Sequence, residues 1–190
     1  MTKILNIAVD AMGGEGSPKK IIDGIIHHSK NAKNINYNIF GDENEIKEQI
    51  KNLKGNSFKI FDTKDKILDT DSPLMAARKG KNSSMWKAIE SVKSKQSDII
   101  ISAGNTGALF VIAKMNLEMI ENIDKPALSA LWPNKLGMNV VLDLGANIEC
   151  SEKNLIDFAI MGSSLFKSLF PKEQPKVALL NICLLYTSDA

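Results

Sequence analysis

Short, uninterrupted apolar runs alternate with longer amphipathic segments along most of the chain, and this alternation constrains the fold more than any other feature of the sequence. The apolar runs are rich in β-branched residues, which is typical of buried strands. The segments between them place apolar residues at helical spacing, as Ile21, Ile22 and Ile25 do. Expected strands cover residues 4–10, 37–42, 57–63, 97–104, 126–133, 138–147 and 176–182, and expected helices cover residues 17–30, 43–55, 72–80, 82–95, 105–120 and 151–170.

Strands that alternate with helices predict an α/β fold with a largely parallel sheet. The strands are continuous apolar runs, which indicates a sheet covered by helices on both faces. Several helix starts carry a serine, which is a good N-cap, and two of these serines precede a proline, which suits the first helical position. The expected N-caps are Ser17, Ser72, Asn82 or Ser83, and Ser151, and Gly55 is expected to end the helix over 43–55.

The composition excludes several classes of protein. The 190 residues include 24 basic and 22 acidic side chains, so the formal net charge is only +2 and no nucleic-acid partner is expected. Two cysteines, Cys150 and Cys183, provide neither a disulfide framework nor a CxxC metal motif, and they favour a reducing compartment. The N-terminus lacks the features of a signal peptide, and no apolar run approaches the roughly 18 residues of a membrane span. We therefore expect a cytoplasmic protein without a bound metal or cofactor.

Three strand ends combine glycine with small polar or acidic residues. Ligands of parallel sheets bind outside the carboxyl ends of the strands, so these corners are the candidate ligand site. The candidate residues are Asp10, Gly13 and Gly14 in "VDAMGGEGS", Gly104, Asn105, Thr106 and Gly107 in "SAGNTGA", and Asp143 and Asn147 in "LDLGAN". Ser83 and Ser84 add two hydroxyls at another helix start.

The "SAGNTGA" corner is suited to an anion. Gly104 removes the Cβ obstacle at the turn, and the first N–H groups of the following helix have no partner within it. The pattern alone favours a simpler interpretation, in which Asn105 or Thr106 merely caps the helix after a tight turn. The same simpler interpretation, capping, applies to Asp10, Asp143, Ser83 and Ser84.

Taken together and in this order, the motifs "AVDAMGGEGSP", "KGKNSSM", "ISAGNTGA", "KPAL", "LDLGAN" and "PKVALLNI" strongly resemble the bacterial phosphate acyltransferase family, PlsX. The resemblance covers residues 4–182. It implies a three-layer α/β/α sandwich with a mostly parallel sheet, like that of phosphotransacetylases and the isocitrate dehydrogenase group. It also implies transfer of an acyl group from acyl carrier protein to inorganic phosphate. The acyl phosphate formed would serve a membrane glycerol-3-phosphate acyltransferase in phospholipid synthesis, and members are homodimers that associate peripherally with the membrane.

The resemblance suggests roles for the candidate residues. Phosphate is already ionised at neutral pH, so positioning and stabilisation of the developing oxyanion are the main tasks. We expect Gly104, Asn105, Thr106 and Gly107 to hold phosphate or the acyl-phosphate head, with Asn105, Thr106 and Asp143 as the catalytic candidates. Further donors are expected at Gly13, Gly14, Ser83 and Ser84, and Asp10, Asp143 and Asn147 are expected to orient the loops.

Two features depart from the family pattern. Glu15 stands where the family usually has aspartate, and residues 183–190 resemble nothing in the family. We expect residues 1–182 to be the N-terminal part of a single domain of a longer protein, with 183–190 a tail of other origin. Two alternatives stay open: a phosphate acetyl- or butyryltransferase that uses coenzyme A, and a non-catalytic phosphate-binding fragment.

A doubly wound sheet cut after its sixth or seventh strand exposes edge strands and apolar helix faces. We therefore predict that the 190-residue polypeptide alone is poorly soluble or inactive. Size-exclusion chromatography, thermal unfolding and an acyl-transfer assay check this. A monodisperse, cooperatively unfolding and active preparation would contradict it.

Overall fold

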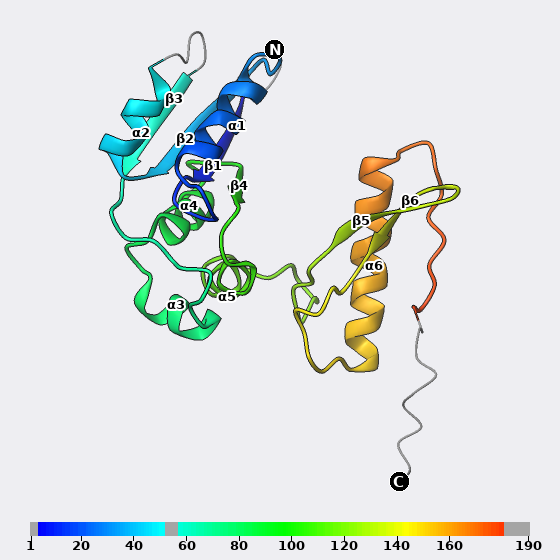
Figure 1. Ribbon diagram of the computed structural model, residues 1–190. Coiled ribbons are helices and arrows are strands. Elements are labelled where there is room, and N and C mark those ends of the chain that lie inside the picture. The colour runs from blue at the N-terminus through cyan, green and yellow to red at the C-terminus, as the bar shows by residue number, and fades with distance from the viewer. Residues whose placement is uncertain (1–3, 52–56, 181–190) are drawn as a thin grey trace. The chain divides into compact units, whose positions relative to one another are not determined.

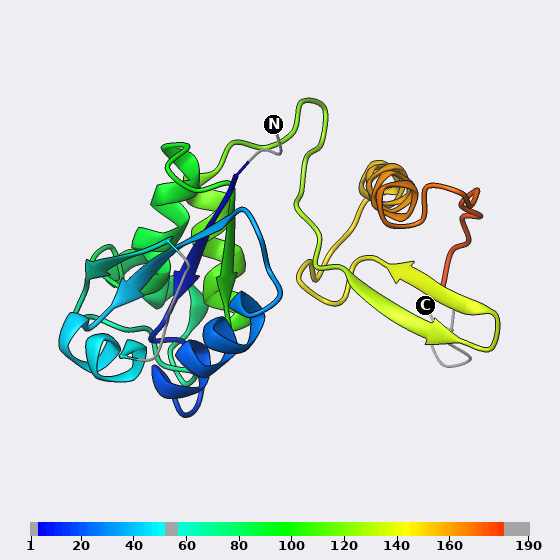
Figure 2. The same cartoon turned by 90° about the horizontal axis from the view of Figure 1, so that it is seen from above.

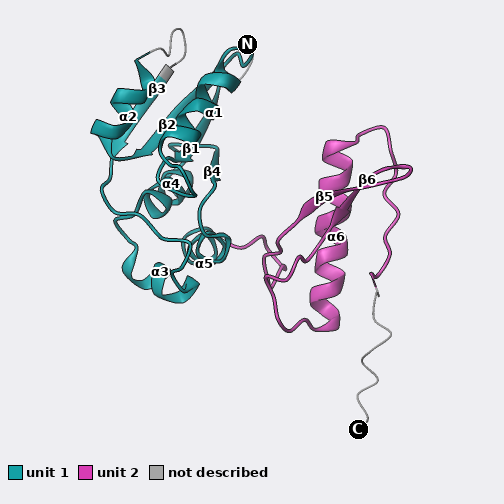
Figure 3. Cartoon of the chain, viewed as in Figure 1, with its two compact units in different colours: residues 1–118 teal, residues 119–190 magenta. Residues whose placement is uncertain are grey.

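The computed structural model describes residues 4–51 and 57–180. The chain forms two compact units, residues 1–118 and 119–190 (Figure 3). The expected end of a helix at Gly55 and the tail over 183–190 lie outside the described residues. Whether the whole chain is part of one larger domain stays a prediction.

The first unit is built on a four-stranded parallel sheet. Its strands are β1 (Leu5–Asp10), β2 (Ile35–Gly41), β3 (Ser57–Asp62) and β4 (Ile99–Ser102), in the order β3-β2-β1-β4. The register places Asp10, the last residue of β1, beside Phe40 on one side and Ser102 on the other. The carboxyl ends of the two central strands therefore meet at one edge of the sheet.

Helices cover both faces of this sheet, as expected (Figures 1 and 2). They are α1 (Lys19–Ser29), α2 (Glu43–Ile50), α3 (Pro73–Lys79), α4 (Ser84–Lys93) and α5 (Thr106–Asn116). On one face, α1 and α2 bury Ile22, Ile25 and Ile46 against residues of β1 and β2. On the other, Ala88 of α4 packs on Ala8 and Phe40. The α/β/α layering predicted for the chain is thus confirmed.

A further core holds the helices of the second face together. It joins the segment before α3 to α3, α4 and α5, through buried side chains that include Ile67, Ala77, Met85, Ile89 and Ile112. This core sets the amino ends of α4 and α5 beside the carboxyl edge of the sheet.

The second unit contains β5 (Ala130–Asn134), β6 (Gly137–Val141) and α6 (Glu152–Leu169). The expected strands over 126–133 and 138–147 are present in part, but they pair antiparallel with each other as a hairpin rather than within the parallel sheet. Of the strand expected over 176–182, the described residues 176–180 are not a strand. No described strand pairs with them, so their backbone lacks the ladder partner that a strand requires. No helix in the described parts of the chain is both long and apolar enough to cross a membrane.

The helix caps test the local predictions directly. Ser72, Ser83 and Ser151 each accept a hydrogen bond from a backbone N–H of the first turn, as predicted. The prediction for Ser17 was wrong, because α1 begins after Pro18 without a side-chain cap. The Ser17 hydroxyl instead donates to the carbonyl oxygens of Gly13 and Gly14 and braces the glycine-rich loop.

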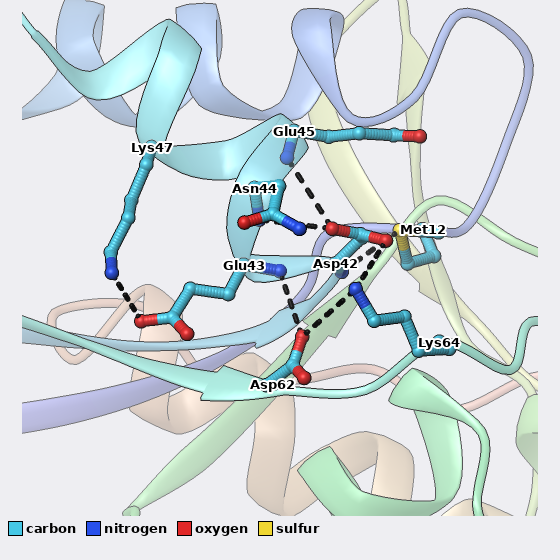
Figure 4. Close-up of polar contacts among 8 residues, drawn as sticks. All are labelled: Met12, Asp42, Glu43, Asn44, Glu45, Lys47, Asp62 and Lys64. Carbon is cyan, nitrogen blue, oxygen red and sulfur yellow. Dashed lines mark hydrogen bonds and ion pairs between the residues drawn. The ribbon is translucent and has the colours of Figure 1, made fainter.

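Asp42 caps α2 and joins it to Lys64, two residues after the end of β3 (Figure 4). Its Oδ1 accepts from the N–H groups of Asn44 at 2.9 Å and Glu45 at 3.4 Å, and its Oδ2 lies 2.9 Å from Lys64 Nζ. The hydrogen bond from Lys64 is the main cause that lowers the pKa of Asp42, and the same bond raises the pKa of Lys64. Asp62 completes the cluster by accepting from Glu43 N–H at 2.9 Å.

We predict that Lys64→Met raises the pKa of Asp42 toward its ordinary value, as followed by NMR titration of the carboxyl carbon. A lowered pKa stabilises the fold above the pKa of the unfolded chain, and this contribution disappears as the pH falls through the folded pKa. The variant should therefore lose stability at neutral pH but not in strong acid. Lys87→Met, which removes only the exposed pair with Glu90, is the matched control. An unchanged Asp42 titration in Lys64→Met would contradict the prediction.

Candidate functional site

The Asp10 side chain joins two of the predicted corners, those that follow β1 and β4, to the start of α4. It is only 1% exposed. Its Oδ1 accepts from Ser84 Oγ at 2.6 Å and from Met12 N at 3.2 Å, and its Oδ2 accepts from Ser102 Oγ at 2.7 Å. One carboxyl group thus joins the end of β1, the start of α4 and the end of β4. This geometry supports the expectation that Asp10 orients the loops.

The glycine-rich loop touches the second corner backbone to backbone. A Cβ at Gly13 would lie 2.6 Å from Asp10 Oδ2 and 2.8 Å from Gly104 N. Gly14 has φ +82°, and a Cβ there would lie 2.6 Å from the carbonyl oxygen of Ala103. Such distances exclude any larger residue without movement of the backbone. The structure therefore brings Gly13, Gly14 and Gly104 together, as the sequence predicted.

Asn105 is the N-cap of α5 and also holds a distant loop. Its Oδ1 accepts from Ala108 N at 3.0 Å. Its Nδ2 donates to the carbonyl oxygen of Asp71 at 2.9 Å, with the carbonyl oxygens of Asp69 and Leu68 at 3.2 and 3.3 Å. These contacts occupy both ends of the side-chain amide. Phosphate binding by Asn105 stays a prediction, and its backbone N–H is the group available for it.

Thr106 and Gly107 open α5. Their N–H groups have no acceptor among the described residues, and they lie at the positive end of the helix dipole. Thr106 is exposed. A Cβ at Gly107 would lie 2.6 Å from Pro73 Cγ, so glycine also allows α5 to pack closely on the start of α3.

Ser83 and Ser84 are both buried, but they face different neighbours. The Ser84 hydroxyl belongs to the Asp10 centre. The Ser83 hydroxyl donates to the carbonyl oxygen of Gly80 at 2.6 Å and caps α4. Ser83 also lines an open pocket of about 480 Å³, whose other walls come from Lys64, Asp65, Lys66, Asp71, Met75, Ala76, Lys79 and Gly80.

Asp143 and Asn147 form a hydrogen-bonded cluster within the second unit. Asp143 Oδ1 accepts from Leu128 N at 2.7 Å, and Oδ2 accepts from Asn147 N at 2.8 Å. Asn147 Nδ2 donates to the carbonyl oxygen of Pro126 at 2.8 Å. These bonds hold the segment before β5 against the loop after β6. Whether either residue contacts substrate stays a prediction.

Ser102 is a participant that the sequence analysis did not single out. It is the last residue of β4, and its hydroxyl both donates to Asp10 and accepts from Gly104 N at 3.1 Å. A polar residue that ends an apolar strand was the available signal. Spacing could not reveal its partner, because Asp10 lies 92 residues away in the sequence.

Comparison with known proteins places these residues in a family context. Residues 5–184 match the family described as "Fatty acid synthesis protein". The chain is 70% identical over 182 residues to the phosphate acyltransferase of Pelagibacter ubique (strain HTCC1062), covering 96% of this chain and 55% of that protein. It is 44% identical over 184 residues to the phosphate acyltransferase of Ehrlichia ruminantium (strain Gardel), covering 94% and 54%. The corresponding protein of Maricaulis maris (strain MCS10) is 41% identical over 186 residues, with 96% and 53% covered. The chain thus spans about half the length of these curated relatives.

We predict that Gly13→Ala destabilises the first unit by about 1–3 kcal/mol, because its Cβ meets Asp10 and Gly104 at less than contact distance. Denaturant unfolding measures the change. The control is Gly24→Ala in α1, where a Cβ meets nothing within 4 Å. That variant should be more stable by about 0.5–1 kcal/mol, because alanine is the better helix former. Equal behaviour of the two variants would refute the close approach at Gly13.

Proposed function

Because the chain belongs to the fatty acid synthesis protein family, in which its similar relatives are named phosphate acyltransferases, we propose that it supplies part of an enzyme that transfers an acyl group to inorganic phosphate. The observation in the structure that carries the proposal is the amino end of α5. Its first N–H groups, which have no acceptor in the described part of the chain, lie beside the close contact of Gly13 with Gly104 at the carboxyl edge of the parallel sheet. Such a corner is suited to a phosphate group.

The proposed reaction is one substitution at a thioester. An oxygen of inorganic phosphate attacks the carbonyl carbon, the carbon–sulfur bond breaks, and the electron pair leaves with the thiol sulfur. The products are acyl phosphate and the free thiol. Phosphate supplies its own nucleophilic oxygen, so the protein's task is to hold it in position and exclude water.

Backbone donors suit this task. Three consecutive N–H groups, those of Asn105, Thr106 and Gly107, have no acceptor among the described residues. They can bind phosphate without placing a side-chain cation on the attacking oxygen, so the oxygen keeps its nucleophilic character. Asp10 has a structural part in this proposal, because both of its oxygens accept hydrogen bonds from protein groups of the corner.

The acyl donor we propose is a thioester of acyl carrier protein, with the acyl phosphate used for phospholipid synthesis. We also propose that the protein is a cytoplasmic homodimer that associates with the membrane surface. A membrane glycerol-3-phosphate acyltransferase would then use the acyl phosphate. These points rest on the motif resemblance. The names of the relatives favour phosphate acyl transfer over a non-catalytic phosphate-binding fragment.

The donor is tested with the complete enzyme to which this chain is proposed to contribute, by measuring acyl phosphate formation from acyl carrier protein thioesters and from coenzyme A thioesters with the same preparation. We expect a higher kcat/KM with the carrier protein. A preference for coenzyme A would instead identify a phosphate acetyl- or butyryltransferase.

The phosphate site is tested by the double variant Asn105→Ala/Thr106→Ala in the same complete enzyme. We expect kcat/KM for phosphate to fall at least about tenfold, because loss of the N-cap releases the first turn of α5 and disorders its N–H groups. The control is Ser94→Ala. Ser94 is the C-cap residue of α4, away from the amino end of α5, and this variant should retain activity. Full phosphate-dependent activity in the double variant would remove the proposed site.

A further inference from the structure

Ser102 stands between a buried acid and a backbone amide. Its Oγ donates to Asp10 Oδ2 at 2.7 Å and accepts from Gly104 N at 3.1 Å. A hydroxyl has one proton and two lone pairs. Since the Asp10 oxygen takes the proton, a lone pair of Ser102 is left to face the Gly104 N–H.

Asp10 holds the Ser102 hydroxyl in one orientation because Asp10 is itself fixed. Its other oxygen accepts from Ser84 Oγ at 2.6 Å and from Met12 N at 3.2 Å. The side chain is 1% exposed, so water does not compete for these bonds. The position of Gly104 is thereby connected to the start of α4 and to the glycine-rich loop.

Side-chain acceptors also define which amides of the corner are free. Ser102 Oγ accepts a hydrogen bond from the Gly104 N–H, and Asn105 Oδ1 accepts one from the Ala108 N–H at 3.0 Å. The three N–H groups between them, at residues 105–107, have no acceptor among the described residues. The free donors are therefore a run of three, with an occupied amide on each side.

We propose that Ser102 is a positioning residue. By bonding both to the fixed Asp10 carboxyl group and to the Gly104 N–H, it holds Gly104 in place, so that the amides of residues 105–107 point at a bound anion. The identity of that anion as phosphate rests on the proposed function. The proposal changes the part assigned to Gly104. Its N–H is used within the protein, and its contribution is the absent Cβ, which would lie 3.0 Å from the Met85 methyl group and 3.1 Å from Gly13 Cα.

The first experiment needs no phosphate. Amide hydrogen exchange at Gly104 is measured by NMR in the unmodified chain and in Ser102→Ala, Ser102→Thr and Ser91→Ala. We expect Ser102→Ala to speed exchange at Gly104 about tenfold, the effect of losing one hydrogen bond, and Ser102→Thr to restore protection because it keeps the hydroxyl. Ser91→Ala is the control, since it removes another hydrogen-bonded serine hydroxyl in the same unit, a buried one, without touching the corner.

Unchanged exchange at Gly104 in Ser102→Ala, or an equal increase in Ser91→Ala, would overturn the inference. The first result would show that Ser102 does not hold the amide, and the second that the effect is general loss of stability.

The second experiment titrates inorganic phosphate and follows the amides of residues 105–107. We expect Ser102→Ala to weaken phosphate binding about tenfold, and Ser102→Thr and Ser91→Ala to bind as the unmodified chain does. Equal affinity in Ser102→Ala would overturn the positioning role. If the unmodified chain's amides do not respond to phosphate, the proposed function fails at this corner, while the exchange experiment still decides whether Ser102 holds Gly104.

Discussion

The buried carboxyl group of Asp10 is the contact on which the candidate site depends. It accepts hydrogen bonds from two serine hydroxyls and one backbone N–H, donated from three separate segments of the first unit. A buried acid that lost one of these donors would be left incompletely hydrogen-bonded at a considerable cost in free energy. The end of β1, the start of α4 and the end of β4 are therefore held in one arrangement.

The corner beside this contact offers backbone N–H groups rather than side-chain charge to the anion that we propose it binds. Gly13 and Gly104 touch without a Cβ between them, and the N–H groups that open α5 immediately afterwards have no acceptor among the residues that the structure describes. Backbone donors are effective only when they are already aimed, because ordering them on binding would consume part of the binding free energy. The Ser102 and Asn105 hydrogen bonds provide that order, the first at the turn and the second at the helix cap.

Predictions from local sequence succeeded where the responsible contacts are local. The caps at Ser72, Ser83 and Ser151 each depend on an N–H group only three residues away. The prediction for Ser17 failed because its hydroxyl donates to carbonyl oxygens of the glycine-rich loop. An N-cap sequence pattern does not include this competing partner. The two strands after residue 119 were recognised as strands, but their antiparallel pairing depends on the tight turn between Asn134 and Gly137 rather than on the apolar pattern.

The sequence alone determines the α/β class, the strands of the parallel sheet and two glycine corners at its carboxyl edge, because periodicity and glycine content are properties of neighbouring residues. It did not show that the third corner, "LDLGAN", follows a strand of the antiparallel hairpin. The partners of the corner residues follow only from the folded chain. Asp10 meets Ser84 across 74 residues and Ser102 across 92, and Asn105 reaches back 34 residues to Asp71. Parallel strands bring distant segments to the same edge, and the side chains that meet there determine which amides are occupied and which are left for an anion.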